Sequence, residues 1–358
     1  MEDLINDAVT SIVKHTKKAK PEEPKSRHKL INSGCTLLNL ACSDNAFGAY
    51  PVGTMIHMAG DSSSGKTILA MTTFAELSHR PSFDGYEFIY DDVEAANAFD
   101  MPRLFGTKAA KRIQAPFKDE PSSCIEDFQA NVLRFVRKEK PFIYVEDSFD
   151  ALTSDMEVDK ADKAAEARDA GKETKGSYGM EKAKIGGQIL RMVCRKIKKT
   201  ESLLMIISQI RDNTDPMSMQ KRTVSGGRAL KFYASLQIWL SLGDKIKSKD
   251  RVIGVTCIAK IMKNKITGKL REVEFPIYYD YGVDDIGACI DFLVKEKHWT
   301  KKDGVITATG AIECKGMRAK LIAHIESQGL EKTLKQETGK VWNRIEESLK
   351  LNRKPKYG

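Results

Sequence analysis

The sequence has none of the features that mark a membrane-spanning or secreted protein. Its apolar runs all fall well short of the roughly 20 residues that a membrane-spanning helix needs. The acidic Glu2 and Asp3 near the start do not fit a secretory signal. The seven cysteines are scattered, and no two have the Cys-x-x-Cys spacing of a zinc site, so we expect reduced thiols. These features predict a cytoplasmic protein without a membrane partner.

Acidic residues are fewer than basic ones. Lys and Arg number 59 against 49 Asp and Glu, which gives a formal net charge of +10. A basic excess favours polyanionic partners, nucleic acid first, although a merely basic enzyme would show the same balance. The hydrophobic share of 41% is that of an ordinary globular protein, so the chain can bury a sizeable core.

The first 30 residues differ in composition from the rest. Residues 2–13 carry apolar side chains at the spacing of one helix face, and residues 14–29 combine many charges with two prolines. We expect an N-terminal oligomerisation helix and linker, residues 1–30, that docks on a neighbouring subunit. Folding of the helix onto its own core is the alternative. The apolar positions are Leu4, Ile5, Ala8, Val9, Ile12 and Val13.

From residue 31 to 283, short apolar runs alternate with helix-length segments, which predicts an α/β core with a mostly parallel sheet covered on both faces. The last three runs are separated by short polar turns and predict an antiparallel extension. Residues 284–358 predict a small α+β C-terminal domain with a basic tail. The predicted strands are Thr54–Ala59, Glu87–Tyr90, Phe142–Val145, Leu203–Ser208, Leu236–Leu240, Val255–Met262, Val273–Tyr279 and, in the C-terminal domain, Gly304–Ala308; the predicted helices are Lys66–Ser78, Cys124–Lys138 and Lys184–Lys198.

A phosphate-binding motif follows the first predicted strand. Residues 60–67 match G-x-x-x-x-G-K-[ST] in full and stand between a strand and a helix. Backbone N–H groups of such a loop bind phosphates, Lys66 reaches the β- and γ-phosphates, and the Thr67 hydroxyl coordinates Mg²⁺. The motif therefore predicts ATP and Mg²⁺, held by Gly60, Asp61, Ser62, Ser63, Ser64, Gly65, Lys66 and Thr67.

Two later strands end in acidic residues that would lie beside this loop. Asp147 is placed to hold Mg²⁺, and the adjacent Glu146 should point to the other face because side chains alternate along a strand. Hydrolysis needs a base that orients the attacking water, and Asp91, Asp92 and Glu94 all stand at the end of one strand. Spacing alone does not choose among these three acids.

A glutamine follows a third, strongly apolar strand. The amide of Gln209 can both accept and donate hydrogen bonds, so it could sense a γ-phosphate and transmit the signal to the loop behind it. The alternative is that Gln209 has no role in function and simply faces water at the end of a strand.

Together these motifs resemble the RecA family, and the resemblance extends from about Ile31 to Ser348. Its strongest pieces are the phosphate loop, the segment LLMIISQIR, and Gly226–Ser235, which is similar to the bacterial RecA segment that closes the second DNA-binding loop. Lys263-Asn-Lys265 and the stretch IDFLVKEK favour the bacterial RecA type. Divergence elsewhere suggests a phage-encoded member similar to the UvsX type, which would work in the host cytoplasm.

The resemblance implies roles for individual residues. Glu94 matches the glutamate that activates water, Asp147 matches the Walker B acid, and Gln209 matches the glutamine that couples nucleotide state to DNA binding. Lys263 and Lys265 match two lysines that reach the ATP of the adjacent subunit. Two residues apart on a strand, they can share one face.

The resemblance also implies two DNA-binding loops. Residues 155–184 stand in the place of the first loop, where this chain is longer and richer in charge, and residues 210–227 match the second. The adenine-stacking tyrosine of the family has no clear counterpart, which leaves Asp100 and Arg103 as candidates near the base. The acidic tail of the family is absent. The DNA-binding candidates are Arg211, Met217, Met219, Lys221, Arg222, Gly226, Gly227 and Arg228.

The sequence thus favours a DNA-dependent ATPase and recombinase that forms a helical filament on single-stranded DNA and exchanges strands with double-stranded DNA. Mediator and single-strand-binding proteins are its further expected partners. One alternative is a RecA-like DNA motor or accessory ATPase, such as a ring helicase or branch remodeller. Another is a RecA-like ATPase that acts on protein partners alone.

Overall fold

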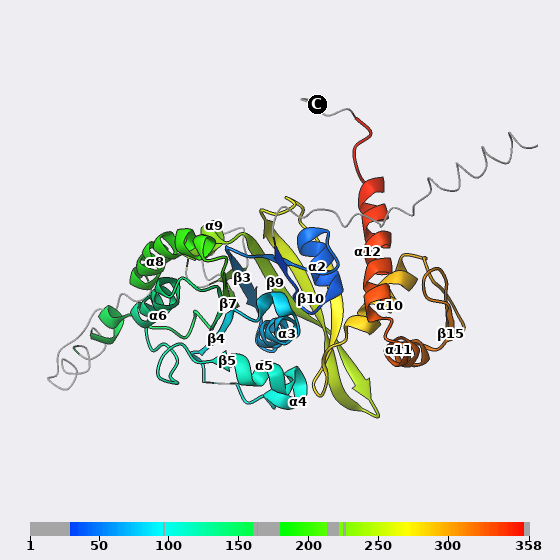
Figure 1. Ribbon diagram of the computed structural model, residues 1–358, viewed down its shortest axis with the longest axis horizontal. Coiled ribbons are helices and arrows are strands. Elements are labelled where there is room, and N and C mark those ends of the chain that lie inside the picture. The colour runs from blue at the N-terminus through cyan, green and yellow to red at the C-terminus, as the bar shows by residue number, and fades with distance from the viewer. Residues whose placement is uncertain are drawn as a thin grey trace, which may run out of the picture.

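The computed structural model describes residues 29–95, 97–159, 163, 180–212, 222–224 and 227–353 (Figure 1). Several predictions concern segments outside these residues. They are the N-terminal helix and its linker, most of the first-loop region, the middle of the second loop with Met217, Met219 and Lys221, and Gly226 near the end of that loop.

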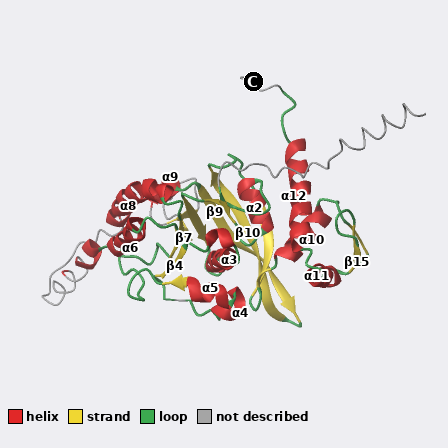
Figure 2. Ribbon diagram, in the orientation of Figure 1, coloured by secondary structure: helices red, strands yellow, loops and turns green. Residues whose placement is uncertain are grey.

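Within the described residues, one ten-stranded sheet forms the centre of the molecule (Figure 2). Its inner strands run parallel, and the last three long strands, β9 to β11, pair antiparallel, so the predicted mostly parallel sheet with an antiparallel extension is confirmed. The strand order is β12 (Gly282–Val283), β11 (Glu272–Tyr278), β10 (Arg251–Asn264), β9 (Leu236–Ser248), β3 (Thr54–Gly60), β7 (Leu203–Asp212), β6 (Phe142–Asp147), β4 (Glu87–Asp92) and β5 (Ile113–Gln114), with β8 (Arg222–Val224) paired to β7.

Helices cover both faces of the parallel strands (Figure 1). The core divides into two clusters of buried side chains, one on each face: Ile143 and Val145 of β6 belong to one cluster, and Phe142 and Tyr144 belong to the other. This burial on both faces explains why the strands read as continuous apolar runs. On one face lie α2 (Thr36–Ser43), α3 (Lys66–Ser78), α4 (Met101–Phe105) and α5 (Thr107–Arg112); on the other lie α6 (Ile125–Arg137), α8 (Met180–Lys199) and α9 (Gly227–Tyr233).

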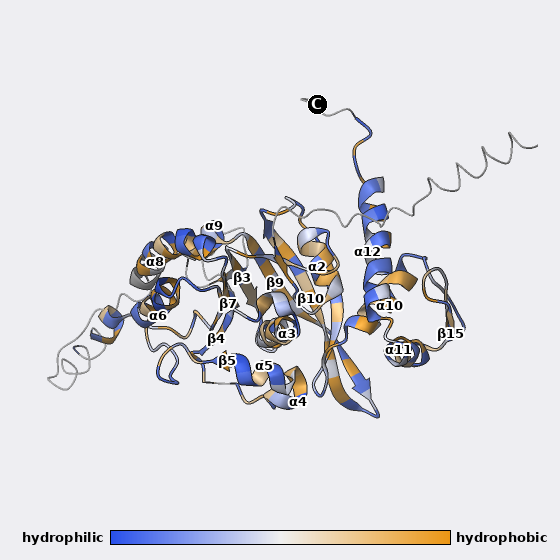
Figure 3. Ribbon diagram, in the orientation of Figure 1, coloured by the Kyte–Doolittle hydropathy of each residue, from blue (hydrophilic) through white to orange (hydrophobic). Residues whose placement is uncertain are grey.

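Residues 285–348 build a second core around Trp299. Three strands form its sheet where the sequence predicted one, because the two outer strands have only three residues each and show no apolar alternation. The last helix is long and mostly hydrophilic (Figure 3). The division at residue 284 stays a prediction. The elements are α10 (Asp285–Lys295), β13 (Thr300–Lys302), β14 (Val305–Ala308), β15 (Cys314–Gly316), α11 (Arg318–Ser327) and α12 (Glu331–Ser348).

The C-terminal helix is linked to the central sheet by the half-buried cation of Arg271. Arg271, which precedes β11, donates to Asp44 at 2.6 Å and pairs with Glu346 of α12 at 2.7 Å. Its guanidinium also lies over the ring of Trp342.

The remaining short elements are a two-stranded ribbon of β1 (Leu30–Ile31) and β2 (Tyr50–Pro51) and a 3-10 turn at Pro81–Phe83. Among the helices that the structure describes, none is both long and apolar enough to cross a membrane.

A buried histidine lies at the middle of the sheet. His57 of β3 is fully buried, its Nε2 lies 3.0 Å from Ser208 Oγ, and its Nδ1 lies 3.1 Å from Gln237 Nε2. Because the Gln237 amide can only donate at that contact, Nδ1 accepts and Nε2 carries the proton. Burial lowers the pKa of His57 to about 4, so the folded protein holds the ring neutral.

We therefore expect stability to fall as the pH drops from 7 towards 4. In this window the unfolded chain protonates His57, with a pKa near 6.5, and the folded chain resists protonation. The loss attributable to this residue between pH 7 and pH 5 is about 2 kcal/mol. Urea unfolding of the parent and of His57→Gln at both pH values measures it. The variant should show a correspondingly smaller pH dependence, and equal dependence in the two proteins would contradict the assignment.

Candidate functional site

The loop at residues 60–67 joins β3 to α3 and is shaped by its glycines. Gly65 caps α3 with φ 92°, and a Cβ there would lie 2.5 Å from Ile277 Cδ1. A Cβ on Gly60 would lie 2.6 Å from both Leu240 O and Ser64 Oγ. Glycine at both positions lets the backbone turn tightly. The loop therefore leads directly into the amino-terminal end of α3, where backbone N–H groups favour an anion.

Lys66 is held inside this loop. It is buried, and its Nζ donates to Gly60 O at 3.0 Å and Asp61 O at 2.7 Å. Burial lowers the pKa of Lys66, and the carboxylates of Asp147 and Glu94 oppose this shift. The ammonium group thus points at the space that the loop encloses.

A hydroxyl and a carboxylate meet where α3 begins and β6 ends. Thr67 Oγ1 donates to Asp147 Oδ2 at 2.7 Å, and Tyr90 OH donates to the same oxygen at 3.1 Å. Burial raises the pKa of Asp147, and these two hydrogen bonds oppose the shift. Mg²⁺ prefers oxygen ligands, and Thr67 and Asp147 together offer a hydroxyl and a carboxylate oxygen. Sequence reasoning missed Tyr90, because its place on the apolar strand β4 gave no polar signal.

The three acids after β4 occupy different environments. Asp91 is fully buried and accepts from Ser122 N and Oγ at 2.7 and 2.6 Å and from Tyr144 OH. Such a satisfied carboxylate fastens β4 to the chain around Ser122 and faces away from the loop. Asp92 accepts from Asn97 N at 3.2 Å.

Glu94 is exposed and lies beside Gln209. Its Oε1 accepts from Gln209 Nε2 at 3.1 Å and from Ser148 Oγ at 2.5 Å. Ser148 follows Asp147, and the peptide bond between them is cis. The structure therefore brings the ends of β4, β6 and β7 together around one carboxylate that faces solvent next to the loop.

Both ends of the second predicted DNA loop touch this site. β7 and β8 pair antiparallel on either side of residues 213–221, with Asp212 opposite Arg222. Arg211 lies 3.6 Å from Asp150, and Arg222 lies 3.5 Å from Asp61 of the phosphate loop. Gly227 and Arg228 open helix α9.

A cavity of about 230 Å³ opens beside the phosphate loop. Residues 63–68 form one wall, and Phe99, Val255, Ile277 and Tyr279 form the rest. The half-buried ring of Phe99 and the exposed ring of Tyr279 lie next to the phosphate loop, where they could pack against the flat base of a nucleotide. Tyr279 directly follows β11 at the loop edge of the sheet, a position that could have been found by asking which strand ends carry an aromatic residue.

The two residues expected near the base do not line this cavity. Asp100 accepts from Arg103 N at 3.2 Å and so caps α4, and the Arg103 side chain pairs with Asp280 at 3.5 Å in solvent. Phe99, which directly precedes Asp100, lines the cavity instead, and the sequence alone could not show which residue of this segment faces the cavity.

Lys263 and Lys265 lie at the opposite edge of the sheet from this chain's own phosphate loop. Lys263 is opposite Gln237 near the start of β9, and Lys265 N bonds Ser235 O. The Nζ of Lys263 donates to the Lys231 and Phe232 carbonyls at the end of α9, at 2.5 and 2.9 Å. Burial, with Lys265 nearby, lowers the pKa of Lys263 to about 8, so a nearby anion would be stabilising here.

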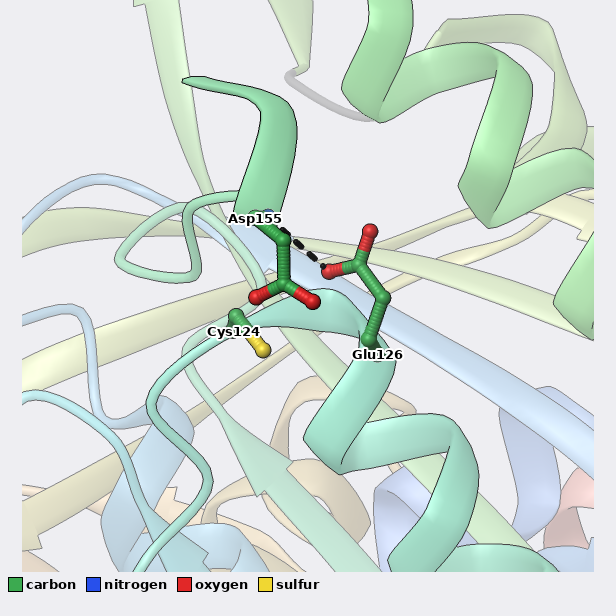
Figure 4. A group of neighbouring side chains, drawn as sticks. All are labelled: Cys124, Glu126 and Asp155. Carbon is green, nitrogen blue, oxygen red and sulfur yellow. Dashed lines mark hydrogen bonds between the residues drawn. The ribbon is translucent and has the colours of Figure 1, made fainter. Parts of the chain in front are cut away.

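A group of three potential metal ligands lies away from the loop, where the first-loop region begins. Figure 4 shows Cys124, Glu126 and Asp155 turned toward one another, with Asp155 N donating to Glu126 at 3.3 Å. The Cys124 Sγ accepts from Asp127 N at 3.4 Å and caps α6. Burial raises the pKa of this thiol to about 12. The observed contacts of this group join the start of α6 to the chain at Asp155, so we assign the group a structural role.

The P-loop class of α/β proteins is defined by a glycine-rich loop between a parallel strand and a helix, with an acidic residue on another strand beside the loop. The family model described as RecA N-terminal domain matches residues 6–284. The chain is 31% identical to Protein RecA of Clostridium beijerinckii over 268 residues, 75% of this chain and 67% of that protein. It is 27% identical to Protein RecA of Zymomonas mobilis over 327 residues, 88% and 85% of the two chains. The chain belongs to the RecA family.

Tyr90 provides a test of the site's geometry in the nucleotide-free protein. Tyr90→Phe should destabilise the fold by about 1.5 kcal/mol, because a hydrogen bond to the buried Asp147 carboxylate is lost. Denaturant unfolding of Tyr90→Phe, Asp147→Asn and the double variant measures the coupling. A coupling energy near zero would show that the hydroxyl does not support this carboxylate.

Proposed function

We propose that the chain is an ATP-dependent DNA recombinase that assembles head to tail on single-stranded DNA and exchanges strands with a duplex. One observation carries the proposal. Thr67 contacts Asp147, the adjacent Ser148 contacts Glu94, and Glu94 contacts Gln209 of β7, so this chain of hydrogen bonds joins the phosphate loop to the strand that leads into the second DNA loop. A change at the phosphates can therefore alter the segment that would hold DNA.

The residues around the loop fit ATP and Mg²⁺. Lys66 and the amino-terminal end of α3 would bind the phosphates, and Phe99 and Tyr279 would flank the base. Thr67 and Asp147 would hold Mg²⁺, directly or through water, because they already present oxygen atoms to each other. When bound, Mg²⁺ neutralises charge on the phosphates.

Glu94 is the proposed base. Its carboxylate can take a proton from water, and the hydrogen bonds from Ser148 and Gln209 to Oε1 leave Oε2 for that task. Gln209 would follow any movement of Glu94 and pass it to Arg211 two residues along β7. The same contact thus serves hydrolysis and coupling.

The position of Lys263 and Lys265 supports an assembled site. These lysines are remote from their own phosphate loop but could reach the ATP of an adjacent copy, as arginine fingers do. A head-to-tail interface that does not close gives a helical filament. Electron microscopy of the protein with single-stranded DNA and a slowly hydrolysed ATP analogue tests the proposal: helical filaments support it, and closed rings would favour a DNA motor.

Glu94→Gln should bind ATP as the parent does but hydrolyse it about 10²–10⁴-fold more slowly, because an amide cannot accept the proton. Its complex with DNA should persist, since hydrolysis no longer resets the interface. Steady-state ATPase and DNA dissociation rates measure both effects. Hydrolysis at the parent rate would transfer the role to another acid.

Replacing both Lys263 and Lys265 with alanine should leave nucleotide binding by a lone protomer intact and greatly reduce DNA-stimulated hydrolysis. An arginine supplied in trans is worth about 10³–10⁵ in rate, and lysine should give less because it lacks the bidentate fork. The sharper measurement mixes this variant with Glu94→Gln.

In such a mixture, a Glu94→Gln protomer lends its lysines to a neighbour whose own Glu94 is intact. The mixture should regain part of the activity that neither variant has alone. If mixing brings no gain over the two separate proteins, the trans assignment is wrong.

A further inference from the structure

The arginines at the two ends of the second loop are both held by acids of the phosphate-binding site. Arg211, at the end of β7, pairs with Asp150, and Arg222, at the start of β8, pairs with Asp61. Arg222 stands opposite Asp212, one residue past Arg211, so the two arginines point to opposite faces of the hairpin. The base of the loop is therefore gripped on both faces.

Each pair joins an accessible cation to a less accessible acid. The side chains of Arg211 and Arg222 are 61% and 52% exposed, whereas Asp150 is 4% and Asp61 36% exposed. A polyanion can thus reach the arginines from solvent, but a cation cannot easily take Asp150 away. Asp150 also accepts from Gln209 N at 2.7 Å, which fixes the carboxylate against β7.

Both acids belong electrostatically to the nucleotide site. The carboxylates of Asp61 and Asp150 each act to raise the pKa of Lys66, although burial lowers it overall. The same two groups therefore contact the loop arginines on one side and influence the phosphate-binding lysine on the other.

We propose that Asp61 and Asp150 act as internal substitutes for nucleic-acid phosphates, holding Arg211 and Arg222 until a DNA strand displaces them. The inference rests on the proposed function, because it assumes that the second loop binds DNA. Every phosphate contact made by these arginines replaces an existing ion pair, so the acids set a threshold for DNA binding. A protein without them should bind DNA more tightly and with less discrimination between nucleotide states.

The test compares Asp61→Asn, Asp150→Asn and the double variant with the parent by fluorescence anisotropy of labelled oligo(dT), with and without a slowly hydrolysed ATP analogue. In Asp150→Asn the amide oxygen can still accept the hydrogen bond from Gln209 N. Each single variant should lower the Kd about threefold, and the double variant about tenfold, the scale of partly exposed ion pairs. Glu272→Gln is the control: it removes the same charge and an exposed pair with Lys260 at 3.6 Å, and should change the Kd by less than about twofold.

A second comparison separates release of an arginine from a general effect of charge. In an Arg211→Gln background, Asp150→Asn should bring no gain in affinity, because the arginine that it releases is gone. A gain that persists there, or single variants that match Glu272→Gln, overturns the inference and leaves the proposed function standing. If the double variant binds and the parent does not, the inference holds and the proposed function fails for the parent. If no variant binds oligo(dT), both are wrong.

Discussion

The hydrogen bond from Thr67 to Asp147 is the contact on which the rest of the site depends. It joins the first turn of α3 to the end of β6, two elements that are 80 residues apart in sequence. Because the inner strands are parallel, the ends of β3, β4, β6 and β7 all reach this edge of the sheet. Ser148 directly follows β6, Glu94 lies two residues after β4, and Gln209 lies within β7 opposite Gly60, so all three lie near this edge. The sheet thus brings these residues to one edge, and the hydrogen bond connects the phosphate loop to the acid at the end of β6.

The fold was predicted well where burial leaves a simple pattern. The seven long strands of the central sheet were predicted, and the short β5, β8 and β12 were not. The inner parallel strands β3, β4 and β6 are buried on both faces and so are continuous apolar runs. Helix α2 was missed because seven of its eight residues are buried, so it shows no apolar stripe. Helices α4 and α5 are too short for periodicity to show.

The candidate site was predicted as a set of residues but not as a set of partners. The motif at residues 60–67 and the acid at the end of β6 are local signals, so the sequence shows them directly. Pairs such as Arg222 with Asp61 depend on tertiary packing. The residues next to each partner in the sequence do not indicate that the two side chains will meet. Membership of the RecA family is confirmed, whereas the role of each residue stays a prediction.

Lys263 and Lys265 lie at one edge of the sheet and the phosphate loop lies at the other, so each protomer carries two unlike halves of the proposed composite site. In an open row of n protomers, one loop and one lysine pair at the ends have no complement, which leaves n − 1 complete sites. A closed ring has n. The rate of hydrolysis per protomer would therefore rise with the length of an open assembly and level off. The turnover number would thus measure the number of subunits in the assembly.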